Sequence, residues 1–295
     1  MQAPRHQNAI VVRAPATSAN LGAGFDCLGL ALDLWNEVVA VPGRPNVGAD
    51  NLILRAARSV FEDVGATFPG FELACANRIP FGRGLGSSAA AITCGVLLAN
   101  TYLGEPLDEA GCLRAATHLE GHPDNVVPCL LGGVCVATLD GDGQVVHARV
   151  PVQLPLQAVA FIPDVRISTV DARALLPTSV PLDDALFNVA RASLLVAALA
   201  TGDAQLLDEA TQDRLHQPYR LGLFPAGGTL LETAMHAGAL AAYTSGAGPT
   251  VLALCADDAQ AAAVSHAFEE CARALEIPGS SLRLALSQRG AHVAR

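Results

Sequence analysis

The chain has 295 residues, of which 51% are hydrophobic, and a formal net charge of −10. This length is sufficient for two globular cores, and the negative charge argues against nucleic acid and anionic membranes as partners. No apolar run reaches the roughly 18 residues of a membrane-spanning helix, and residues 1–9 lack the apolar core of a secretory signal.

The first half of the chain alternates strands with helices. The apolar run 9–13 predicts a strand, and a glycine-punctuated loop follows it over residues 14–26. Residues 35–41 predict a second strand, which Pro42 and Gly43 end. Further on, periodicity and turn residues predict helices over 51–64, 88–103 and 108–119, a strand over 132–139 and a turn over 140–143.

The pattern starts again near residues 151–155. It predicts strands over 157–162, 250–256 and 282–286, and helices over 183–199, 203–212, 228–238 and 257–275. The alternation in both halves indicates two domains that mix helices and strands, which we place at residues 1–150 and 151–295.

Two residue types narrow the chemistry. The chain contains no lysine, which excludes a Walker A loop, the strand lysine of protein kinases and a pyridoxal phosphate Schiff base. The eight cysteines form no Cys-x-x-Cys pair and several lie in apolar segments. We therefore expect reduced, buried thiols and a cytoplasmic location.

Residues 78–91 form the most informative segment. Three glycines at alternate positions, two serines and an alanine run predict a flexible loop that turns directly into a helix, with one serine as the helix cap. Backbone N–H groups and a helix N-terminus favour a bound anion. A tight strand-to-helix connection explains the segment equally well. In a chain without lysine, a phosphate here would be held by backbone amides, the helix, a metal and Arg83.

Three other polar segments accompany this loop. Residues 17–26 present Asn20 and Asp26 after a strand, although such side chains often bond only to their own turn. Residues 118–125 end a helix and continue into a loop stiffened by proline, and Glu120 there has the right chemistry for Mg²⁺. A polar helix terminus is the simpler interpretation. The turn 245–250 again exposes bare backbone before a strand.

In this order and spacing, the four segments resemble the motifs of the small-molecule kinases that include galactokinase, homoserine kinase, mevalonate kinase and phosphomevalonate kinase. Four stretches are similar to the homoserine kinases in particular: residues 15–26, residues 122–126 with Pro128, residues 187–191 and residues 213–220.

The resemblance implies a fold, a reaction and an assembly. The expected fold is two α+β domains, of which the first contains an unusual left-handed β-α-β crossover and the second is ferredoxin-like. The expected reaction is ATP-dependent phosphorylation of the side-chain hydroxyl of L-homoserine, which gives O-phosphohomoserine on the route to threonine. ATP would lie between the domains, and many members of the family are homodimers.

The same resemblance assigns roles in ATP binding. It implies a phosphate-binding set of Pro80, Gly82, Arg83, Gly84, Leu85, Gly86, Ser87, Ser88, Ala89 and Ala90. Ser88 and Glu120 match the family's magnesium-binding pair. Asn51 matches its adenine-pocket asparagine, although an ordinary helix cap explains Asn51 equally well.

Homoserine carries a negative carboxylate and a positive ammonium group, so its site needs a cation for the carboxylate and acceptors for the ammonium group. By resemblance, Arg191 and Arg220 bind the carboxylate, and Asn20 and Asp26 bind the ammonium group. The remaining residues implied are His122, Asp124 and Gly246 for substrate binding, and Asp124 and Asn125 for catalysis.

The mechanism and the substrate have alternatives. Asp124 either accepts the hydroxyl proton as a general base or only positions the substrate, whose hydroxyl then attacks the γ-phosphate directly. A related kinase for another alcohol would be favoured if Arg191 and Arg220 did not converge. A non-catalytic ATP or metabolite sensor would be expected to lack the glycine loop or the metal ligands, and both are present here.

Overall fold

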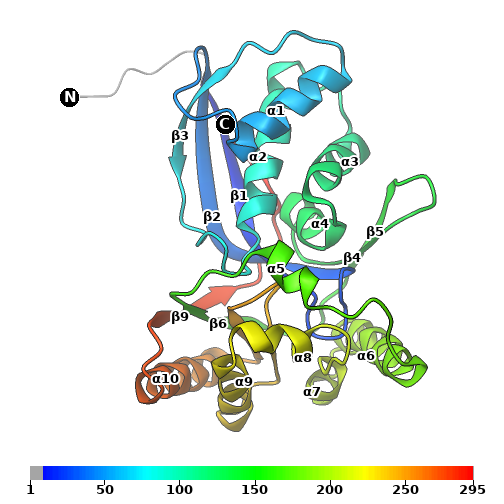
Figure 1. Ribbon diagram of the computed structural model, residues 1–295, viewed down its shortest axis with the longest axis vertical. Helices are drawn as coiled ribbons and strands as arrows, with labels where there is room; N and C mark the ends of the chain where they lie inside the picture. The colour runs from blue at the N-terminus through cyan, green and yellow to red at the C-terminus, as the bar shows by residue number, and fades with distance from the viewer. Residues whose placement is uncertain (1–8, 295) are drawn as a thin grey trace.

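The computed structural model describes residues 9–294. Figure 1 shows two lobes with a waist between them. The first part of the chain forms β1 (Ile10–Ala19), β2 (Leu28–Pro42), α1 (Leu52–Asp63), β3 (Phe71–Ala76), α2 (Ser87–Tyr102), α3 (Glu109–Glu120), α4 (Pro123–Leu131), β4 (Val134–Leu139) and β5 (Val145–Val150). The second part forms β6 (Gln157–Pro163), α5 (Thr169–Ala174), α6 (Leu182–Thr201), η1 (Ala204–Leu206), α7 (Leu207–Ala210), α8 (Gln217–Arg220), η2 (Leu221–Leu223), α9 (Ala226–His236), β7 (Ala241–Thr244), β8 (Val251–Cys255), α10 (Asp258–Ala274), β9 (Gly279–Ala285) and β10 (His292–Ala294).

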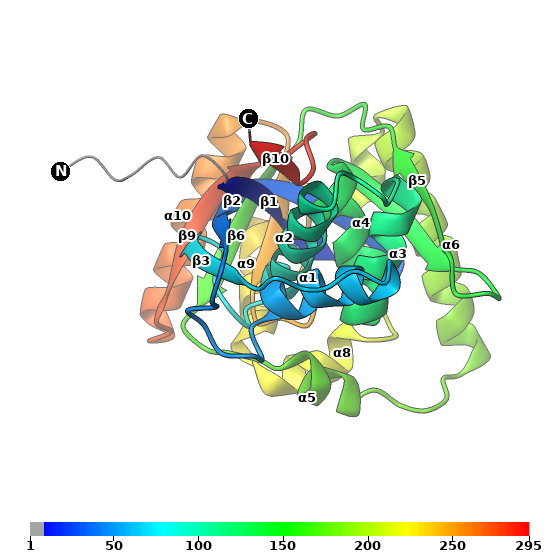
Figure 2. The ribbon, with the colours of Figure 1, turned by 90° about the horizontal axis from the view of Figure 1, so that it is seen from above.

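The first sheet is antiparallel, with the order β10-β1-β2-β4-β5, and β3 pairs with another part of β2. Figure 2 shows α1, α2, α3 and α4 together on one side of β1 and β2. Since β3 and β4 both run antiparallel to β2, they are parallel to each other. The left hand of the connection between them stays a prediction.

The second sheet has the order β7-β8-β6-β9, and every pair is antiparallel. Its chain order is strand, helices, two strands, helix and strand, with β6 and β8 in the centre. This is the ferredoxin-like arrangement, as expected. Phe161 on β6 packs against Phe268 on α10, with ring centroids 5.9 Å apart.

The end of the chain returns to the first sheet. Val11 and Val12 on β1 pair with Ala294 and Val293 on β10. The division at residue 150 therefore did not anticipate that the last strand belongs with the first lobe. As a domain boundary, the position near residue 150 stays a prediction.

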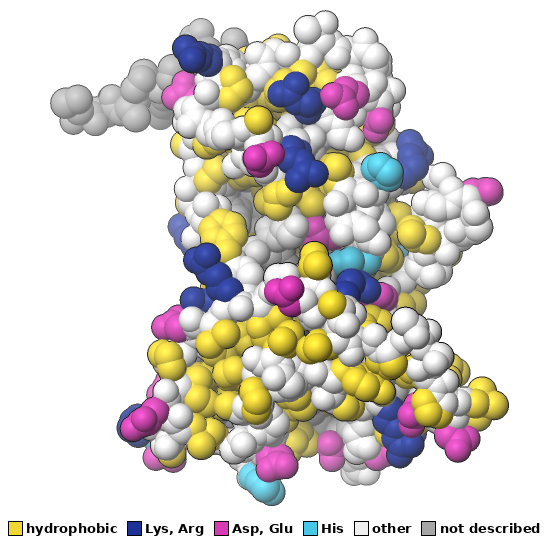
Figure 3. Space-filling model, viewed as in Figure 1, with side chains coloured by type: hydrophobic (Ala, Val, Ile, Leu, Met, Phe, Trp, Pro, Cys, Tyr) yellow, Lys and Arg dark blue, Asp and Glu magenta, His cyan; other side chains and the backbone are white. Residues whose placement is uncertain are grey.

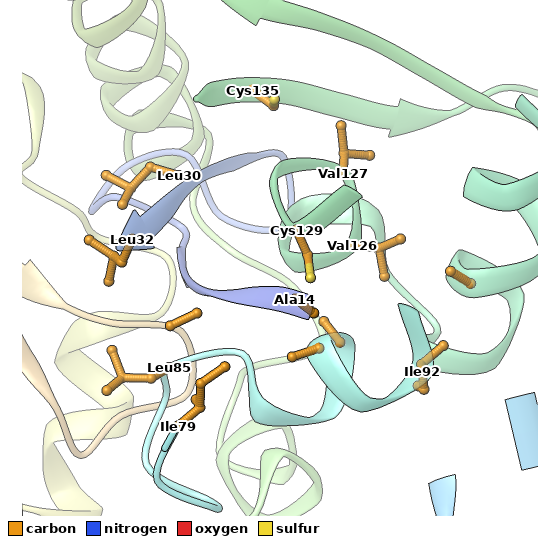
Figure 4. Packing of buried hydrophobic residues seen from close by; sticks show 14 of the residues in the cluster. Ala14, Leu30, Leu32, Ile79, Leu85, Ile92, Val126, Val127, Cys129 and Cys135 are labelled. Carbon is orange, nitrogen blue, oxygen red and sulfur yellow. The ribbon is translucent and has the colours of Figure 1, made fainter. Parts of the chain in front are cut away.

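Small residues bring helices close together in the core of the first lobe. A Cβ on Gly95 of α2 would lie 2.2 Å from the carbonyl oxygen of Ile53 on α1, so only glycine fits there. Ile79 and Leu85, each 1% exposed, belong to this core and are drawn in Figure 4. Burial of each stabilises the fold by about 2 kcal/mol. They anchor the two ends of the glycine-rich loop.

Local patterns predicted α1, α2 and α3 to within about one residue at each end. The loop expected after residue 122 is wrong, because residues 123–131 form α4. Pro123 occupies the first turn, where proline's missing N–H costs no hydrogen bond. Likewise, the helix expected over 203–212 is divided into η1 and α7.

Helix α6 has one buried and one exposed side. Leu195, Ala198 and Leu199 are buried, whereas Leu182 and Val189 are exposed. By length and composition alone α6 is apolar enough to cross a membrane, which the sequence analysis did not anticipate. Many helices of globular proteins meet the same criterion. The absence of a membrane partner stays a prediction.

Candidate active site

A pocket lies between the two lobes, where Figure 3 shows the surface hollowed at the waist. Of the site residues expected from sequence, it is lined by Asn20, Asp26, Gly82, Arg83, Gly84, Gly86, Ser87, Ser88, Glu120, His122, Asp124, Asn125, Arg220 and Gly246. Those outside this lining are Asn51, Pro80, Leu85, Ala89, Ala90 and Arg191. Residues from distant parts of the chain therefore meet here.

Two glycines of the loop are required by geometry. Gly84 and Gly86 have φ values of +77° and +67°, in the left-handed region that favours glycine. A Cβ on Gly84 would lie 2.2 Å from the Ser245 carbonyl oxygen, and one on Gly86 would lie 1.8 Å from Thr17 Oγ1. The loop thus passes close to the 245–250 turn and to β1, which explains why these three motifs occur together.

The expected serine cap of α2 is wrong. Gly86 is the N-cap residue, and no side chain accepts from the first turn of the helix. The N–H groups of that turn therefore keep no capping partner within the described chain. Together with the helix dipole, they make the lining between Gly84 and Ser88 a suitable site for phosphate.

Ser88 and Glu120 form an oxygen pair beside this loop. Ser88 Oγ donates to Glu120 Oε2 at 2.7 Å. Burial raises the pKa of Glu120 above its ordinary value, although the Ser88 hydrogen bond and the His122 charge partly offset it. Residues 9–294 contain no cluster of three or more His, Cys, Asp or Glu side chains that could hold a metal. A hydroxyl and a carboxylate nevertheless fit Mg²⁺, which completes its shell with water and phosphate oxygens.

Asp124 lies in the first turn of α4 and is 2% exposed. Its Oδ1 is 2.6 Å from His122 Nδ1. Burial opposes protonation of His122, but the Asp124 hydrogen bond and the charges of Asp124 and Glu120 raise its pKa overall. Asn125 follows on the same turn, and its Oδ1 accepts from Thr17 Oγ1 at 2.7 Å. These hydrogen bonds hold His122, Asp124 and Asn125 in the lining of the pocket.

Arg173 on α5 makes a two-pronged ion pair with Asp26. Its Nη1 and Nη2 donate to Asp26 Oδ2 and Oδ1 at 2.9 and 2.7 Å. Nearby, Arg220 is 4% exposed and donates from Nη1 to the Gly246 carbonyl at 3.0 Å. Burial, followed by the Arg173 charge, lowers the pKa of Arg220. Two guanidinium groups and one carboxylate thus share one side of the pocket.

The expected convergence of Arg191 and Arg220 is not found. Arg191 forms an ion pair with Glu209, and its guanidinium carbon lies 3.3 Å from the ring centre of Phe187. The pocket lining contains Arg173 instead. Sequence reasoning missed Arg173, because no helix was predicted over residues 169–174 and no local pattern marks that arginine.

A side pocket adjoins the main pocket at Ser87 and Ser88. It is lined by Asn36, Val38, Asn51, Leu52, Ile53, Cys75, Asn77, Phe81, Ser87, Ser88, Ala90, Ala91 and Cys94. Asn51 Oδ1 accepts from the N–H groups of Ile53 and Leu54 at 3.0 and 3.3 Å. Asn51 is therefore both the helix cap and part of a pocket wall, so the two interpretations are compatible.

Comparison with known proteins agrees with this arrangement. Residues 51–133 match the family model "GHMP kinases N terminal domain", and residues 195–274 match "GHMP kinases C terminal". The chain is 45% identical over 258 residues to the homoserine kinase of Moorella thermoacetica, a match that covers 83% of this chain and 87% of that protein. It is 40% identical over 309 residues to a Synechococcus homoserine kinase, covering 99% and 98% of the two chains.

Solved structures of kinases from the same family are also similar to this chain. The crystal structure of a homoserine kinase from Cytophaga hutchinsonii matches with a TM-score of 0.89 and 30% identity, covering 100% of both chains. The mevalonate kinase of L. major shares the fold, with a TM-score of 0.72 at 16% identity.

The two lobes, the glycine loop and the pocket between them define a GHMP kinase fold. Within this class, the homoserine kinases match the chain over nearly its whole length. The chain belongs to the homoserine kinase family.

Proposed function

We propose that the chain transfers the γ-phosphoryl group of ATP to the side-chain hydroxyl of L-homoserine. The observation that carries this proposal is one pocket that joins a phosphate-type loop to a set of charges suited to an amino acid. Its lining contains Gly84 and Gly86 together with Asp26, Arg173 and Arg220. A substrate with both a carboxylate and an ammonium group satisfies all three charges.

ATP would occupy the main pocket and the side pocket, which share Ser87 and Ser88 in their linings. Its phosphates would lie on the backbone of residues 84–88, at the N-terminus of α2, and its base in the side pocket beside Asn51 and Phe81. Mg²⁺ would be held by Ser88 and Glu120, and when bound it supplies positive charge to the phosphate oxygens.

Homoserine would occupy the main pocket. Arg173 and Arg220 would bind its carboxylate, and Asp26 its ammonium group. Asn20 supports this end of the site, since its Nδ2 donates to the Gly246 carbonyl at 2.9 Å and its Oδ1 accepts from the Asp26 N–H at 3.0 Å. The hydroxyl would then reach toward Asp124 and Asn125.

For the chemical step, we favour direct attack of the hydroxyl oxygen on the γ-phosphorus. The new O–P bond forms as the bond to the β-phosphate oxygen breaks, and the hydroxyl proton passes to a phosphoryl oxygen. The Asp124 carboxylate is already engaged by His122, with Oδ1 2.6 Å from Nδ1. Its role would be to orient the hydroxyl, and catalysis would come from positioning and charge.

The alternatives are less well supported. Separation of Arg191 from Arg220 would have favoured another alcohol, but Arg173 provides the second guanidinium. A sensor without activity would not need Ser88 and Glu120 bonded beside the loop. A homodimer, a cytoplasmic location and the role in threonine biosynthesis are further predictions of the family resemblance.

A coupled ADP-release assay tests the function. Mg-ATP is combined with L-homoserine, mevalonate, galactose or no acceptor. ADP release with L-homoserine alone supports the proposal. Turnover of another alcohol would overturn the substrate, and ATP binding without turnover would favour the sensor.

A further inference from the structure

Asn36 on β2 occupies an unusual position in the first sheet. Backbone pairing between β2 and β3 stops at Glu37 and Ala76, one residue before Asn36. Beyond this point the Asn36 side chain replaces the backbone ladder. Its Oδ1 accepts from the N–H groups of Arg78 and Ile79 at 2.7 and 2.9 Å. A residue from β2 thus holds the chain just before the phosphate loop.

These two hydrogen bonds fix the orientation of the Asn36 amide. Two N–H donors require the oxygen on their side, so the NH₂ group must face the other way. Asn36 is 4% exposed and lines the side pocket. Within residues 9–294, hydrogen bonds are made to Asn36 Oδ1 but none is made from Asn36 Nδ2. Among the described residues, Nδ2 is not one of the fully buried side-chain atoms that lack a partner, so it stays open to the side pocket and is available to a ligand there.

The segment that Asn36 holds determines where the loop begins. Ile79 is 1% exposed and anchored in the core, and the glycine-rich residues follow directly. The loop ends at the first turn of α2. Fixing both ends matters because an error of about 1 Å in a bound group can cost two orders of magnitude in rate.

We propose that Asn36 is a positioning residue for the nucleotide. Its Oδ1 holds the start of the phosphate loop, and its Nδ2 donates to an acceptor atom of the nucleoside in the side pocket. One side chain therefore connects the binding of the base with the placement of the phosphates. The inference rests on the proposed function, in that ATP is the nucleotide.

Two variants separate the two halves of this role. Asn36→Ala removes both the acceptor and the donor, whereas Asn36→Asp keeps the acceptor and removes the donor. Asn46→Ala is the matched control, because Asn46 also makes two side-chain bonds to backbone, with the N–H and carbonyl of Leu73 at 2.9 Å each. Asn46 does not line the side pocket.

We expect Asn36→Ala to raise the KM for Mg-ATP about tenfold or more, with the KM for homoserine changed less than twofold. Asn46→Ala should lower Tm without changing either KM. Asn36→Asp should keep its Tm and raise the inhibition constant of adenosine about fivefold, as expected for one lost hydrogen bond. Adenosine is the probe because it is neutral and feels no repulsion from the new carboxylate.

The proposal is overturned if Asn36→Ala and Asn46→Ala both lower Tm and leave the KM for Mg-ATP unchanged. It is also overturned if adenosine inhibits Asn36→Asp as strongly as the parent protein. Failure of the proposed function is distinguishable, because the Kd values for Mg-ATP and adenosine can be measured by calorimetry without any acceptor. A parent protein that binds ATP but ignores homoserine still allows the variants to be compared by these Kd values and by Tm.

Discussion

Replacement of Arg173 by alanine gives the sharpest test of the homoserine site. In the proposed complex the Arg173 guanidinium binds the substrate carboxylate. After the substitution, Arg220 is the one guanidinium left to bind that carboxylate. A hydrogen bond to a charged group contributes about 1.5–3 kcal/mol. Arg173 is partly exposed, with 36% of its side chain accessible, so we take this range for the whole contact rather than for each bond. It corresponds to a rise of roughly 10- to 150-fold in the KM for homoserine.

Stability should respond much less than substrate binding. The side chains of Arg173 and Asp26 are 36% and 35% exposed, and ion pairs with this exposure contribute about 0–1 kcal/mol. The Tm of Arg173→Ala should therefore fall by a few degrees at most. A large KM effect with a small Tm effect separates a binding residue from a structural one.

Arg191→Ala is the matched control. This arginine resembles a carboxylate-binding residue in sequence, but it pairs with Glu209 outside the pocket. Its KM for homoserine should stay within twofold of the parent value. The assay is coupled ADP release at saturating Mg-ATP, with the KM for ATP measured in parallel. A large rise for Arg191→Ala, combined with no change for Arg173→Ala, would refute the assignment.

Three further predictions concern the other side of the pocket. Because burial raises the pKa of Glu120, the folded protein without metal should lose stability as the pH rises through that pKa, and Mg²⁺ should stabilise it only at higher pH. In thermal melts Glu120→Gln should abolish this pH dependence, and in the assay it should raise the Mg²⁺ requirement about tenfold or more. Asp124→Asn should keep about a tenth or more of kcat if Asp124 orients the hydroxyl, and a loss of about a thousandfold with unchanged KM values would show that it is a base. Gly86→Ala should lower Tm and ATP affinity, because its Cβ would lie 1.8 Å from Thr17 Oγ1 at a φ of +67°, whereas Gly48→Ala, with no heavy atom within 4 Å, should leave both unchanged in the same melt and titration.

Short-range patterns carried most of what could be predicted. The phosphate loop depends on glycine conformations and on a helix that begins at once, and both are visible in consecutive residues. The same holds for α1, where Asn51 caps an amphipathic helix. Family resemblance extended this reach to Glu120, which lies 32 residues from Ser88 in sequence and 2.7 Å from it in space.

Contacts between side chains that are far apart in the sequence could not be predicted from local patterns. Arg173 and Asp26 are 147 residues apart, and the short helix that carries Arg173 has no strong periodicity. Arg191, by contrast, lies in a long helix with an obvious pattern. Arg191 was assigned by the family resemblance, and no local pattern pointed to Arg173 in its place. Which guanidinium reaches the pocket depends on the path of the connection between β6 and α6, and local propensity does not specify that path.

The absence of lysine leaves the phosphates without an evident cationic side chain. Arg83, the cation expected for this role, lines the pocket but donates from Nη1 to Asp164 Oδ1 at 2.8 Å. The adjacent Gly82 carbonyl accepts from the Ile167 N–H at 3.0 Å. Both bonds tie the phosphate loop to the connection that carries Arg173. In the proposed complex, charge neutralisation would fall to the backbone amides of residues 84–88 and to a metal at Ser88 and Glu120, while the Arg83 bond to Asp164 joins the loop to the connection that carries Arg173.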